Sequence, residues 1–511
     1  MPATGQNGGY AQAEALVRNH QWDEGLALVE RLLKDEPRNT RELNLAGLAL
    51  TGKGDIQQAD AYFEKCLAVN PGFVPALKNL AINEYNQKHY TAAEKHLLAA
   101  QKETPGDPVV NLYLGEIAYA QQNFERASSA LSLAPGLAAR SANVAAHLAV
   151  SYLLTGQKQK ALDLLDRLTP EQVDSQAQFA LGIALAQSEM PERAVPYLDS
   201  VHRSFPDSYD PGFDLALVYL NIRDYPHAIQ VGADLIGRGR ETAELNNVLA
   251  EAYDANNQTQ QAVDAMRRAI ALAPDDENNY LDFVTLCMNH RSYDAGMKVI
   301  QAGLETHPKS DKLIFMRGVL YGMQDEFELA EKDFQQAAAV APQTNLGYVG
   351  LGVTYLEKGN AGRAIEVLKQ RLAEKPNDAS LLYLLGEALI RNGAAPGQPA
   401  YAEAQSALEK SVHLNPNLCL PHVSLGTIYL DEERLREAVE QFEQARAIDP
   451  KERAAYSHLA VAYRRLGQTD RSKEVMNALK ELIDGERRAT REKMKKSAQG
   501  DGAEGSTEKA H

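Results

Sequence analysis

Cysteine is rare in this chain of 511 residues, and basic residues are outnumbered by acidic ones. The three cysteines, Cys66, Cys287 and Cys419, lie far apart and form no CxxC pair, so neither a disulfide framework nor a zinc site is predicted. Lys and Arg number 53 against 69 Asp and Glu, which gives a net charge of −16 and a pI near 5.3. Such a field repels phosphate backbones and anionic lipid surfaces, and we therefore predict no nucleic-acid partner.

Long hydrophobic runs are missing as well. No stretch approaches the ~20 apolar residues that a membrane-spanning helix needs. The longest candidate, residues 143–156, is too short and contains His147. The first nine residues have neither a basic region nor an apolar segment of the kind found in signal peptides. We expect no membrane insertion and a cytoplasmic location, with a periplasmic one as the alternative if a signal peptide has been removed.

Motifs that carry catalytic chemistry are also missing. The segment from Gly47 to Gly54 comes close to a phosphate-binding P-loop, but its last position is Gly54 where a Ser or Thr would bind magnesium. No HExxH pair and no GxSxG elbow occurs in the sequence. The sequence therefore predicts no enzyme, no metal site and no cofactor.

The chain does contain a repeat with a period of 34 residues. The segments LNLAGLALTGKGDIQQADAYFEKCLAVNP (43–71) and IFMRGVLYGMQDEFELAEKDFQQAAAVAP (314–342) place Gly, Ala, Phe and Pro at the same spacings. Eleven of the thirteen steps between repeat starts are 34 residues long. Extending this register predicts repeats that start at Gln6, Thr40, Val74, Pro108, Ala142, Ser175, Tyr209, Ala243, Glu277, Asp311, Asn345, Ala379, Cys419 and Arg453.

Two positions of each repeat are almost always small. Position 8 is Gly or Ala in thirteen of the fourteen repeats, and so is position 20. Apolar residues around them recur at helical spacing, which predicts two amphipathic helices in each repeat. Antiparallel helices approach closely only where both carry small side chains at the crossing, and a large residue at position 24, such as Phe63, fills the space beside it.

Proline stands at position 32 in ten repeats, for instance Pro71 and Pro342, and predicts the end of the second helix. The small residues at 8 and 20 and the proline at 32 resemble the tetratricopeptide repeat. The resemblance covers residues 6–486 and implies an all-α fold, an α-solenoid of about fourteen stacked helix-turn-helix hairpins in a right-handed superhelix. It also implies that the first helix of each hairpin lines a concave groove.

The departures from the pattern suggest how the array is divided. Pro135 lies near the end of the second helix of repeat 4, and repeat 7 ends in a Gly-Arg-Gly-Arg segment that starts at Gly237. We expect joints at both places. The predicted parts are a short extension (1–5), repeats 1–4 (6–141), repeats 5–14 (142–486) with an inserted loop at about 394–400, and a basic and then disordered tail (487–511).

In this family, ligands contact mostly positions 2, 5, 6, 9, 12 and 13 of the first helices. The clamp of Lys and Asn that some members use to grip a terminal carboxylate is not matched, because Lys78 is followed by Ile82 where the clamp has Asn. The asparagine ladder at position 6, known from members attached to a sugar transferase, is not matched either.

The ligand-contact positions do contain a run of apolar residues at position 5, and acidic residues flank it. We predict partner binding by Phe179, Phe213, Asp214, Glu251, Leu281, Asp282, Phe315 and Tyr383. Such a stripe suits a polypeptide segment with apolar anchors and basic flanks. The alternative is that position 5 packs against the neighbouring hairpin and contacts nothing else.

The predicted function is therefore a protein-interaction scaffold that binds an unidentified protein or peptide. A non-catalytic subunit of a secretion, polysaccharide-export or sugar-transfer complex would have the same array, so the sequence does not separate the two. An RNA-reading helical repeat is the third hypothesis, and the acidic positions argue against it. Nothing in the sequence indicates an oligomeric state.

Overall fold

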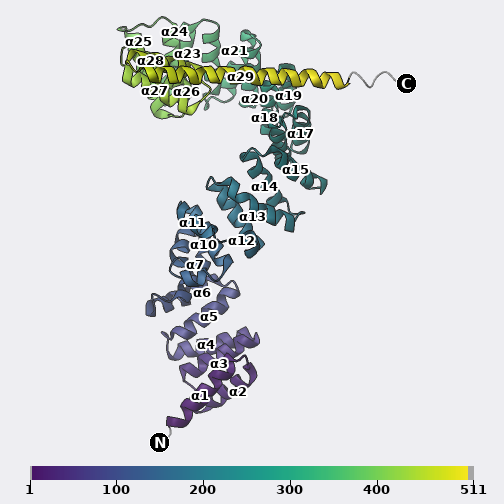
Figure 1. Ribbon diagram of the computed structural model, residues 1–511, viewed down its shortest axis with the longest axis vertical. Helices are drawn as coiled ribbons and strands as arrows, with labels where there is room; N and C mark the ends of the chain where they lie inside the picture. Colours follow the sequence, from purple (N-terminus) through teal and green to yellow (C-terminus); the bar gives the residue numbers. More distant parts are fainter. Residues whose placement is uncertain (1–2, 505–511) are drawn as a thin grey trace, which may run out of the picture. The chain divides into compact units, whose positions relative to one another are not determined.

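The computed structural model describes residues 3–504, and every regular element in that range is helical (Figure 1). This confirms the predicted all-α solenoid of hairpins. The chain divides into two compact units, residues 1–265 and 266–511, and the division falls inside α17 (Thr259–Leu272). The sequence did not single out this position. The boundary expected between residues 141 and 142 stays a prediction.

In unit 1 the helices alternate between the first and the second helix of successive hairpins. The first helices are α1 (Ala3–Arg18), α3 (Thr40–Lys53), α5 (Val74–Asn86), α7 (Pro108–Ala120), α10 (Ala142–Leu154), α12 (Ser175–Gln187), α14 (Tyr209–Asn221) and α16 (Ala243–Ala255). The second helices are α2 (Trp22–Asp35), α4 (Ile56–Val69), α6 (Tyr90–Glu103), α8 (Phe124–Leu131), α11 (Lys158–Leu165), α13 (Pro191–Ser204) and α15 (Tyr225–Gly237).

Unit 2 continues the alternation. Its first helices are α18 (Glu277–Asn289), α20 (Asp311–Met323), α22 (Leu346–Glu357), α24 (Ala379–Arg391), α26 (Cys419–Asp431) and α28 (Arg453–Arg465). Its second helices are α19 (Tyr293–Thr306), α21 (Phe327–Val340), α23 (Ala361–Glu374), α25 (Pro399–Leu414), α27 (Leu435–Ile448) and α29 (Thr469–Glu504). From Thr40 onward the predicted repeat starts coincide with helix starts, except that Asn345 is the N-cap of α22 and precedes its first residue.

Side chains at the start of the helices explain these bounds. Asp107 accepts hydrogen bonds from the backbone N–H groups of Val109 and Val110 at 2.8 and 3.2 Å, and Asp378 accepts one from Leu381 at 2.9 Å. Such caps pair donors that the first turn of a helix leaves without an acceptor. At the other end, α4 stops at Val69, two residues before Pro71.

Position 15 of every repeat lies in the turn inside the hairpin and is in the left-handed conformation, and the longer loop of repeat 12 has a second such residue, Gly397. Glycine holds this position in five hairpins: Gly54, Gly156, Gly359, Gly393 and Gly467. In the other nine it is held by His20, Lys88, Gln122, Glu189, Arg223, Asn257, Arg291, Asp325 and Glu433, all exposed. A side chain makes this conformation less favourable, so nine turns carry local strain.

The core of a hairpin is built by the small residue at position 8 and the large one at position 24. A Cβ added to Gly318 would lie 2.7 Å from the ring of Phe334, and one added to Gly426 would lie 2.6 Å from Phe442. The same relation joins Gly47 to Phe63 at 2.4 Å. Each phenylalanine at position 24 thus lies against a glycine at position 8, because even a methyl group would occupy the space of the ring.

The irregular parts of the array are also visible. Helix α8 has only eight residues and is followed by the four-residue helix α9 (Pro135–Ala138), whereas the insertion in repeat 12 forms the loop that separates α24 from α25. The predicted disorder of the C-terminal tail differs from the structure, since α29 continues to Glu504. The segment contains no proline between Thr469 and Glu504 that would end the helix. The rest of that predicted tail, 505–511, lies outside the described residues.

Candidate functional site

The first helices of each unit form one continuous surface. Each first helix contacts the first helix of the next hairpin, from α1 to α16 in unit 1 and from α18 to α28 in unit 2. With the exception of the short helix α11, the second helices listed above pack on the first helix of their own hairpin and, where a further hairpin follows, on that of the next one, as α4 does with α3 and α5. We use "first-helix surface" for the side chains at positions 2, 5, 6, 9, 12 and 13 of the first helices.

The predicted site residues all lie on first helices, but they form two groups. Phe179, Phe213, Asp214 and Glu251 belong to α12, α14 and α16 of unit 1. Leu281, Asp282, Phe315 and Tyr383 belong to α18, α20 and α24 of unit 2.

In unit 1 the two phenylalanines are half-buried. Phe179 packs against a buried cluster that includes Leu181 and Leu198. Phe213 stacks on Tyr209 one turn earlier, with ring centroids 5.2 Å apart and an angle of 18° between the rings. Both rings therefore have a packing role, as the alternative interpretation of position 5 expected, and their exposed parts face the first-helix surface. Their role in partner binding stays a prediction.

The two acids of unit 1 differ in environment. Asp214 is half-buried beside Phe213, and burial, followed by repulsion from Asp210, raises its pKa to about 6. Glu251 is exposed on α16. A carboxylate with a raised pKa gains from an added positive charge, because the cation offsets the lost hydration.

In unit 2, Leu281 and Phe315 are half-buried on the neighbouring helices α18 and α20. Phe315 packs on Phe334, with centroids 5.2 Å apart. Asp282 is an exposed residue, and desolvation of its carboxyl by the neighbouring protein, followed by repulsion from Asp276, raises its pKa.

Tyr383 lies on α24, packed against the hydrophobic core of unit 2. Burial, followed by the nearby Glu387 carboxylate, raises its pKa to about 12. Its hydroxyl is therefore protonated at neutral pH and can donate a hydrogen bond.

The sequence analysis did not single out three exposed apolar residues of the first-helix surface. Leu217, Met323 and Val353 are 37%, 45% and 44% exposed, and they occupy positions 9, 13 and 9 of their repeats. Reading positions 9 and 13 in the repeat register, as was done for position 5, would have found them. Exposed apolar side chains of this kind can serve as binding surface without first leaving a core contact.

A second group that the sequence analysis missed is centred on Glu116 of α7. This buried carboxylate accepts a hydrogen bond from the Tyr85 hydroxyl at 3.4 Å and lies 3.0 Å from Nδ1 of His147. The His147 ring stacks on Tyr119 with centroids 4.1 Å apart. The group links α5, α7 and α10, so it holds three successive first helices in register.

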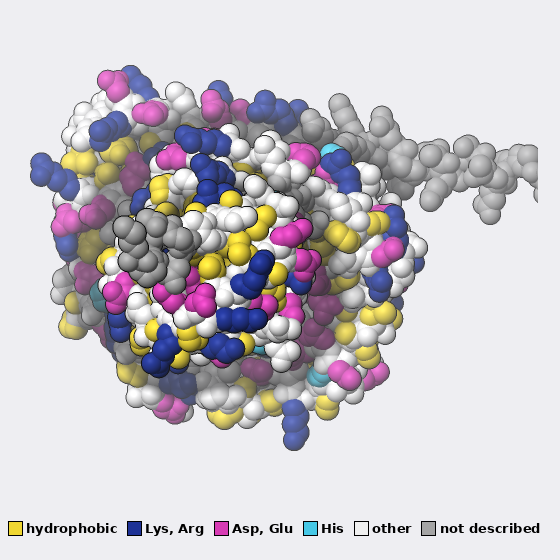
Figure 2. Space-filling model, turned by 90° about the horizontal axis from the view of Figure 1, so that it is seen from below, with side chains coloured by type: hydrophobic (Ala, Val, Ile, Leu, Met, Phe, Trp, Pro, Cys, Tyr) yellow, Lys and Arg dark blue, Asp and Glu magenta, His cyan; other side chains and the backbone are white. Residues whose placement is uncertain are grey.

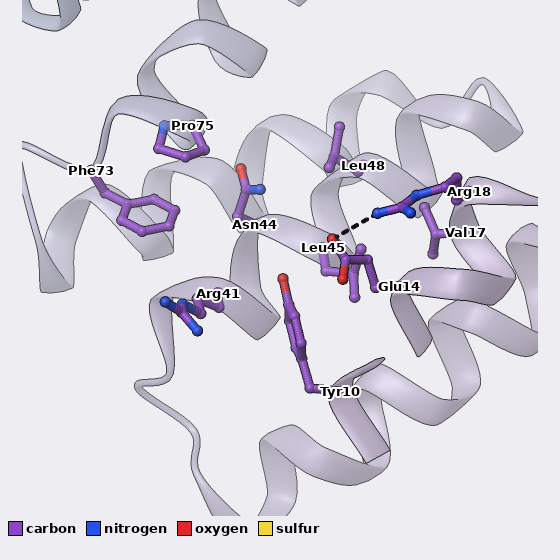
Figure 3. A pocket seen from close by; sticks show the side chains of 10 residues that line it. All are labelled: Tyr10, Glu14, Val17, Arg18, Arg41, Asn44, Leu45, Leu48, Phe73 and Pro75. Atoms are coloured by element: carbon purple, nitrogen blue, oxygen red, sulfur yellow. Dashed lines mark hydrogen bonds and ion pairs between the residues drawn. The ribbon is translucent and has the colours of Figure 1, made fainter. Parts of the chain in front are cut away.

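A cavity of about 540 Å³ lies near the N-terminal end of the first-helix surface (Figure 3). Its polar lining is Tyr10, Glu14 and Arg18 of α1 together with Arg41 and Asn44 of α3. Its apolar lining is Val17, Leu45, Leu48, Phe73 and Pro75. Figure 3 shows the Tyr10 side chain extending from α1 toward α3, with Arg41 and Asn44 around it.

On the face shown in Figure 2, acidic, basic and hydrophobic side chains are intermingled. Within residues 3–504, no group of three His, Cys, Asp or Glu side chains is arranged to hold a metal ion. None of the helices described in that range combines the length and apolar character that crossing a bilayer requires.

Sequence models of the tetratricopeptide repeat match this chain in several places. One matches residues 50–110 and 429–490, and a second matches residues 10–72, 213–277, 315–379 and 351–412. Together these matches extend from residue 10 to residue 490, with residues 111–212 and 278–314 as the main unmatched segments.

Curated relatives are distant in sequence. The BBSome complex member BBS4 of Bos taurus is 25% identical over 224 residues, 42% of this chain and 41% of the relative. The CTR9 homolog of Arabidopsis thaliana is 22% identical over 78% of this chain, which spans 31% of that protein. The repeat-containing protein YpiA of Bacillus subtilis is 20% identical over 69% of this chain and 85% of its own length. This chain thus spans less than half of the first two relatives.

Solved structures with a similar arrangement include yeast Tom70, which is 14% identical. That match covers 91% of this chain and 96% of Tom70, with a TM-score of 0.47. The Cut9–Hcn1 assembly of the APC/C is 15% identical over 90% of this chain and 97% of the matched chain, with a TM-score of 0.35.

Proposed function

Because the chain belongs to the tetratricopeptide repeat family, we propose that it is a non-catalytic scaffold that binds partner polypeptide segments along its first-helix surface. Stacked repeats present an extended surface to which every hairpin contributes, and proteins of this architecture generally use it to hold other proteins. The proposal concerns the first-helix surface, including Phe179, Phe213, Leu281, Phe315 and Tyr383 as candidate contacts.

The observation that supports this proposal most directly is the set of exposed apolar residues on successive first helices of unit 2. Met323 lies on α20 and Val353 on α22, and these two helices are in contact. Acids stand nearby on the same surface, among them Asp282 and Glu387. A partner segment with apolar side chains and flanking Lys or Arg fits this chemistry, because it covers the apolar residues and neutralises the acids.

The test is a pair of double variants in unit 2. Met323→Ser with Val353→Ser removes apolar contact area from the first-helix surface. The matched control, Leu329→Ser with Val340→Ser, changes two residues of α21 that are 38% and 37% exposed. All four side chains are exposed, so both variants are expected to remain folded, which circular dichroism would check.

We expect proteins captured from an extract of the native cell by the unmodified chain to be depleted at least about fivefold by the first variant, since losing two apolar contacts weakens binding by about 1–2 kcal/mol. The control variant is expected to capture them as the unmodified chain does. Quantitative mass spectrometry of the captured proteins provides the measurement. Equal loss in both variants, or loss in neither, would remove the first-helix surface of unit 2 as the binding site.

A further inference from the structure

We propose that the cavity near the N-terminal end binds a peptide segment in which an Asp or Glu side chain adjoins a bulky apolar side chain (Figure 3). The inference rests on the proposed function in one respect, namely that the ligand is a polypeptide. It concerns other residues, on α1 and α3, and a ligand of opposite charge to the one proposed for unit 2.

Three hydrogen-bond donors face this cavity without an acceptor. Among the residues whose side chains the structure describes, neither the Tyr10 hydroxyl nor the Arg41 guanidinium has a hydrogen-bond or ion-pair partner. The amide oxygen of Asn44 accepts a hydrogen bond from Nδ2 of Asn79 at 3.0 Å, which leaves Nδ2 of Asn44 as a donor toward the cavity. The Tyr10 hydroxyl and the Asn44 amide are partly removed from water, and such donors gain from an acceptor that enters with the ligand.

The Arg41 guanidinium favours a carboxylate as that acceptor. Glu14 is the acidic residue of the lining, and it is engaged by Arg18 at 3.3 Å. Arg41 therefore keeps a positive charge that no described carboxylate neutralises, in a chain whose net charge is −16. A guanidinium binds a carboxylate with two parallel hydrogen bonds, and these are stronger than bonds between neutral groups.

The apolar residues of the lining account for the second part of the ligand. Val17 and Leu45 are buried, whereas Leu48 and Phe73 are half-buried, and Pro75 has no backbone N–H to offer. A Leu, Ile or Phe side chain placed there would cover these apolar residues. A ligand that carries only a charge would leave them in contact with water, so the site selects the combination of a carboxylate and an apolar group.

The acid is assigned to a side chain within the peptide and not to its C-terminus. The cavity opens onto the first-helix surface, which continues from α3 to α5 and α7. The next cation along it, Lys78, is already bound to Asp107 at 2.7 Å. A bound chain can therefore continue past the cavity toward α5 and α7, with its acidic side chain turned toward Arg41.

The test measures the binding of three short peptides to the full chain by ligand-observed NMR titration. The first peptide is acetyl-Gly-Glu-Leu-Gly-amide, the second replaces Glu with Gln, and the third is the Gln peptide with a free C-terminal carboxylate. We expect the Glu peptide to bind about tenfold more tightly than either of the others, as a charge-assisted hydrogen bond predicts.

Two variants assign the site. Arg41→Gln is expected to weaken the Glu peptide about tenfold and Tyr10→Phe about threefold, as the loss of a charged and of a neutral donor predicts. Arg140→Gln, which removes an exposed arginine outside the cavity, is the control and should change nothing. The proposal is overturned if the Gln peptide binds as well as the Glu peptide, or if the free carboxylate binds best. It is equally overturned if Arg41→Gln has no effect, or if none of the peptides binds.

These outcomes are distinct from a failure of the proposed function. The cavity belongs to unit 1, whereas the capture experiment changes Met323 and Val353 of unit 2. Normal capture through unit 2 together with no peptide binding at the cavity would reject only the present inference. Peptide binding at the cavity without any capture through unit 2 would reject only the unit 2 surface.

Discussion

Asp214 shows what a single residue of the first-helix surface does to the stability of the protein. In the unfolded chain its pKa would be near the ordinary value of 3.8, and in the folded protein it is raised to about 6. Between these two values the folded state binds more protons than the unfolded state. The free energy of unfolding therefore falls as the pH rises through this window, and the loss is complete above about pH 6 to 7.

Replacing the carboxylate with a neutral amide removes this loss. We expect Asp214→Asn to stabilise the chain by on the order of 1 kcal/mol at pH 7.5, since a pKa unit corresponds to about 1.4 kcal/mol and the half-buried site is partly screened by solvent. Near pH 4 the variant should be little different from the unmodified chain. Thermal unfolding at a series of pH values provides the measurement. Glu251→Gln, an exposed acid on the next first helix, serves as the control.

A difference between Asp214→Asn and the unmodified chain that does not change between pH 4 and 7.5 would contradict this account. Such a result would show that the amide acts through its shape or its hydrogen bonds. The same raised pKa also bears on binding. A Lys or Arg that docks beside Asp214 would lower its pKa, so binding would release fewer protons with an Asn at this position.

At the scale of a helix, two glycines of α20 distinguish the effect of an added methyl group on core packing from its effect on the flexibility of the unfolded chain. A Cβ on Gly318 would lie 2.7 Å from the Phe334 ring, which is buried in the hairpin core, whereas a Cβ on Gly322 meets nothing within 4 Å. Both residues lie in the same helix and have helical backbone conformations. An added methyl group thus strains the core at one and only restricts the unfolded chain at the other.

We expect Gly318→Ala to destabilise the chain by about 1–3 kcal/mol and Gly322→Ala to stabilise it by about 0.5–1 kcal/mol. Denaturant unfolding followed by circular dichroism measures both. Pairing Gly318→Ala with Phe334→Leu should recover part of the lost stability, because the smaller side chain makes room for the methyl group. Equal effects of the two single substitutions would mean that the close contact with Phe334 does not limit the packing of this hairpin.

Most of the architecture could be predicted from the sequence because it depends on local signals that recur. The small residues at positions 8 and 20 and prolines such as Pro71 set the helix crossings and helix ends, whatever the distant contacts are. The left-handed turn residues were not predictable in the same way. Lys88 and Arg291 have no intrinsic preference for that conformation and adopt it because the two helices on either side must pack.

The candidate site was less predictable. The spacing placed Phe179 and Phe315 on first helices, but it could not show how much of each ring a neighbouring hairpin covers. The cavity at Tyr10, Arg41 and Asn44 depends on the distance between two helices from different repeats. The repeat pattern of the sequence does not predict that distance.

At the scale of the whole molecule, the helices that share substantial contacts within residues 3–504 are always close in the chain, at most three elements apart. Free energy in such an array is a sum of hairpin terms and of terms between neighbours. A local change should therefore act locally, and the unfolding of the full chain is not expected to be a single two-state transition.

Hydrogen exchange followed by mass spectrometry tests this property. We expect Gly318→Ala to speed amide exchange by about five- to a hundredfold in α20, α21 and α22, as a loss of about 1–3 kcal/mol predicts. Exchange in α3 to α7 of unit 1 should be unchanged. Faster exchange throughout both units would show instead that the array opens as one cooperative body.

The turns of the hairpins give this additive array a further property. Nine of them hold a side chain in a backbone conformation that suits glycine, and these side chains are exposed. Each such turn is a place where a single change to glycine relieves strain without altering the residues that face a ligand. The ease with which each of these nine hairpins opens is thus adjustable one hairpin at a time, independently of what the array binds. A protein engineer could grade rigidity along the chain and leave its recognition chemistry intact.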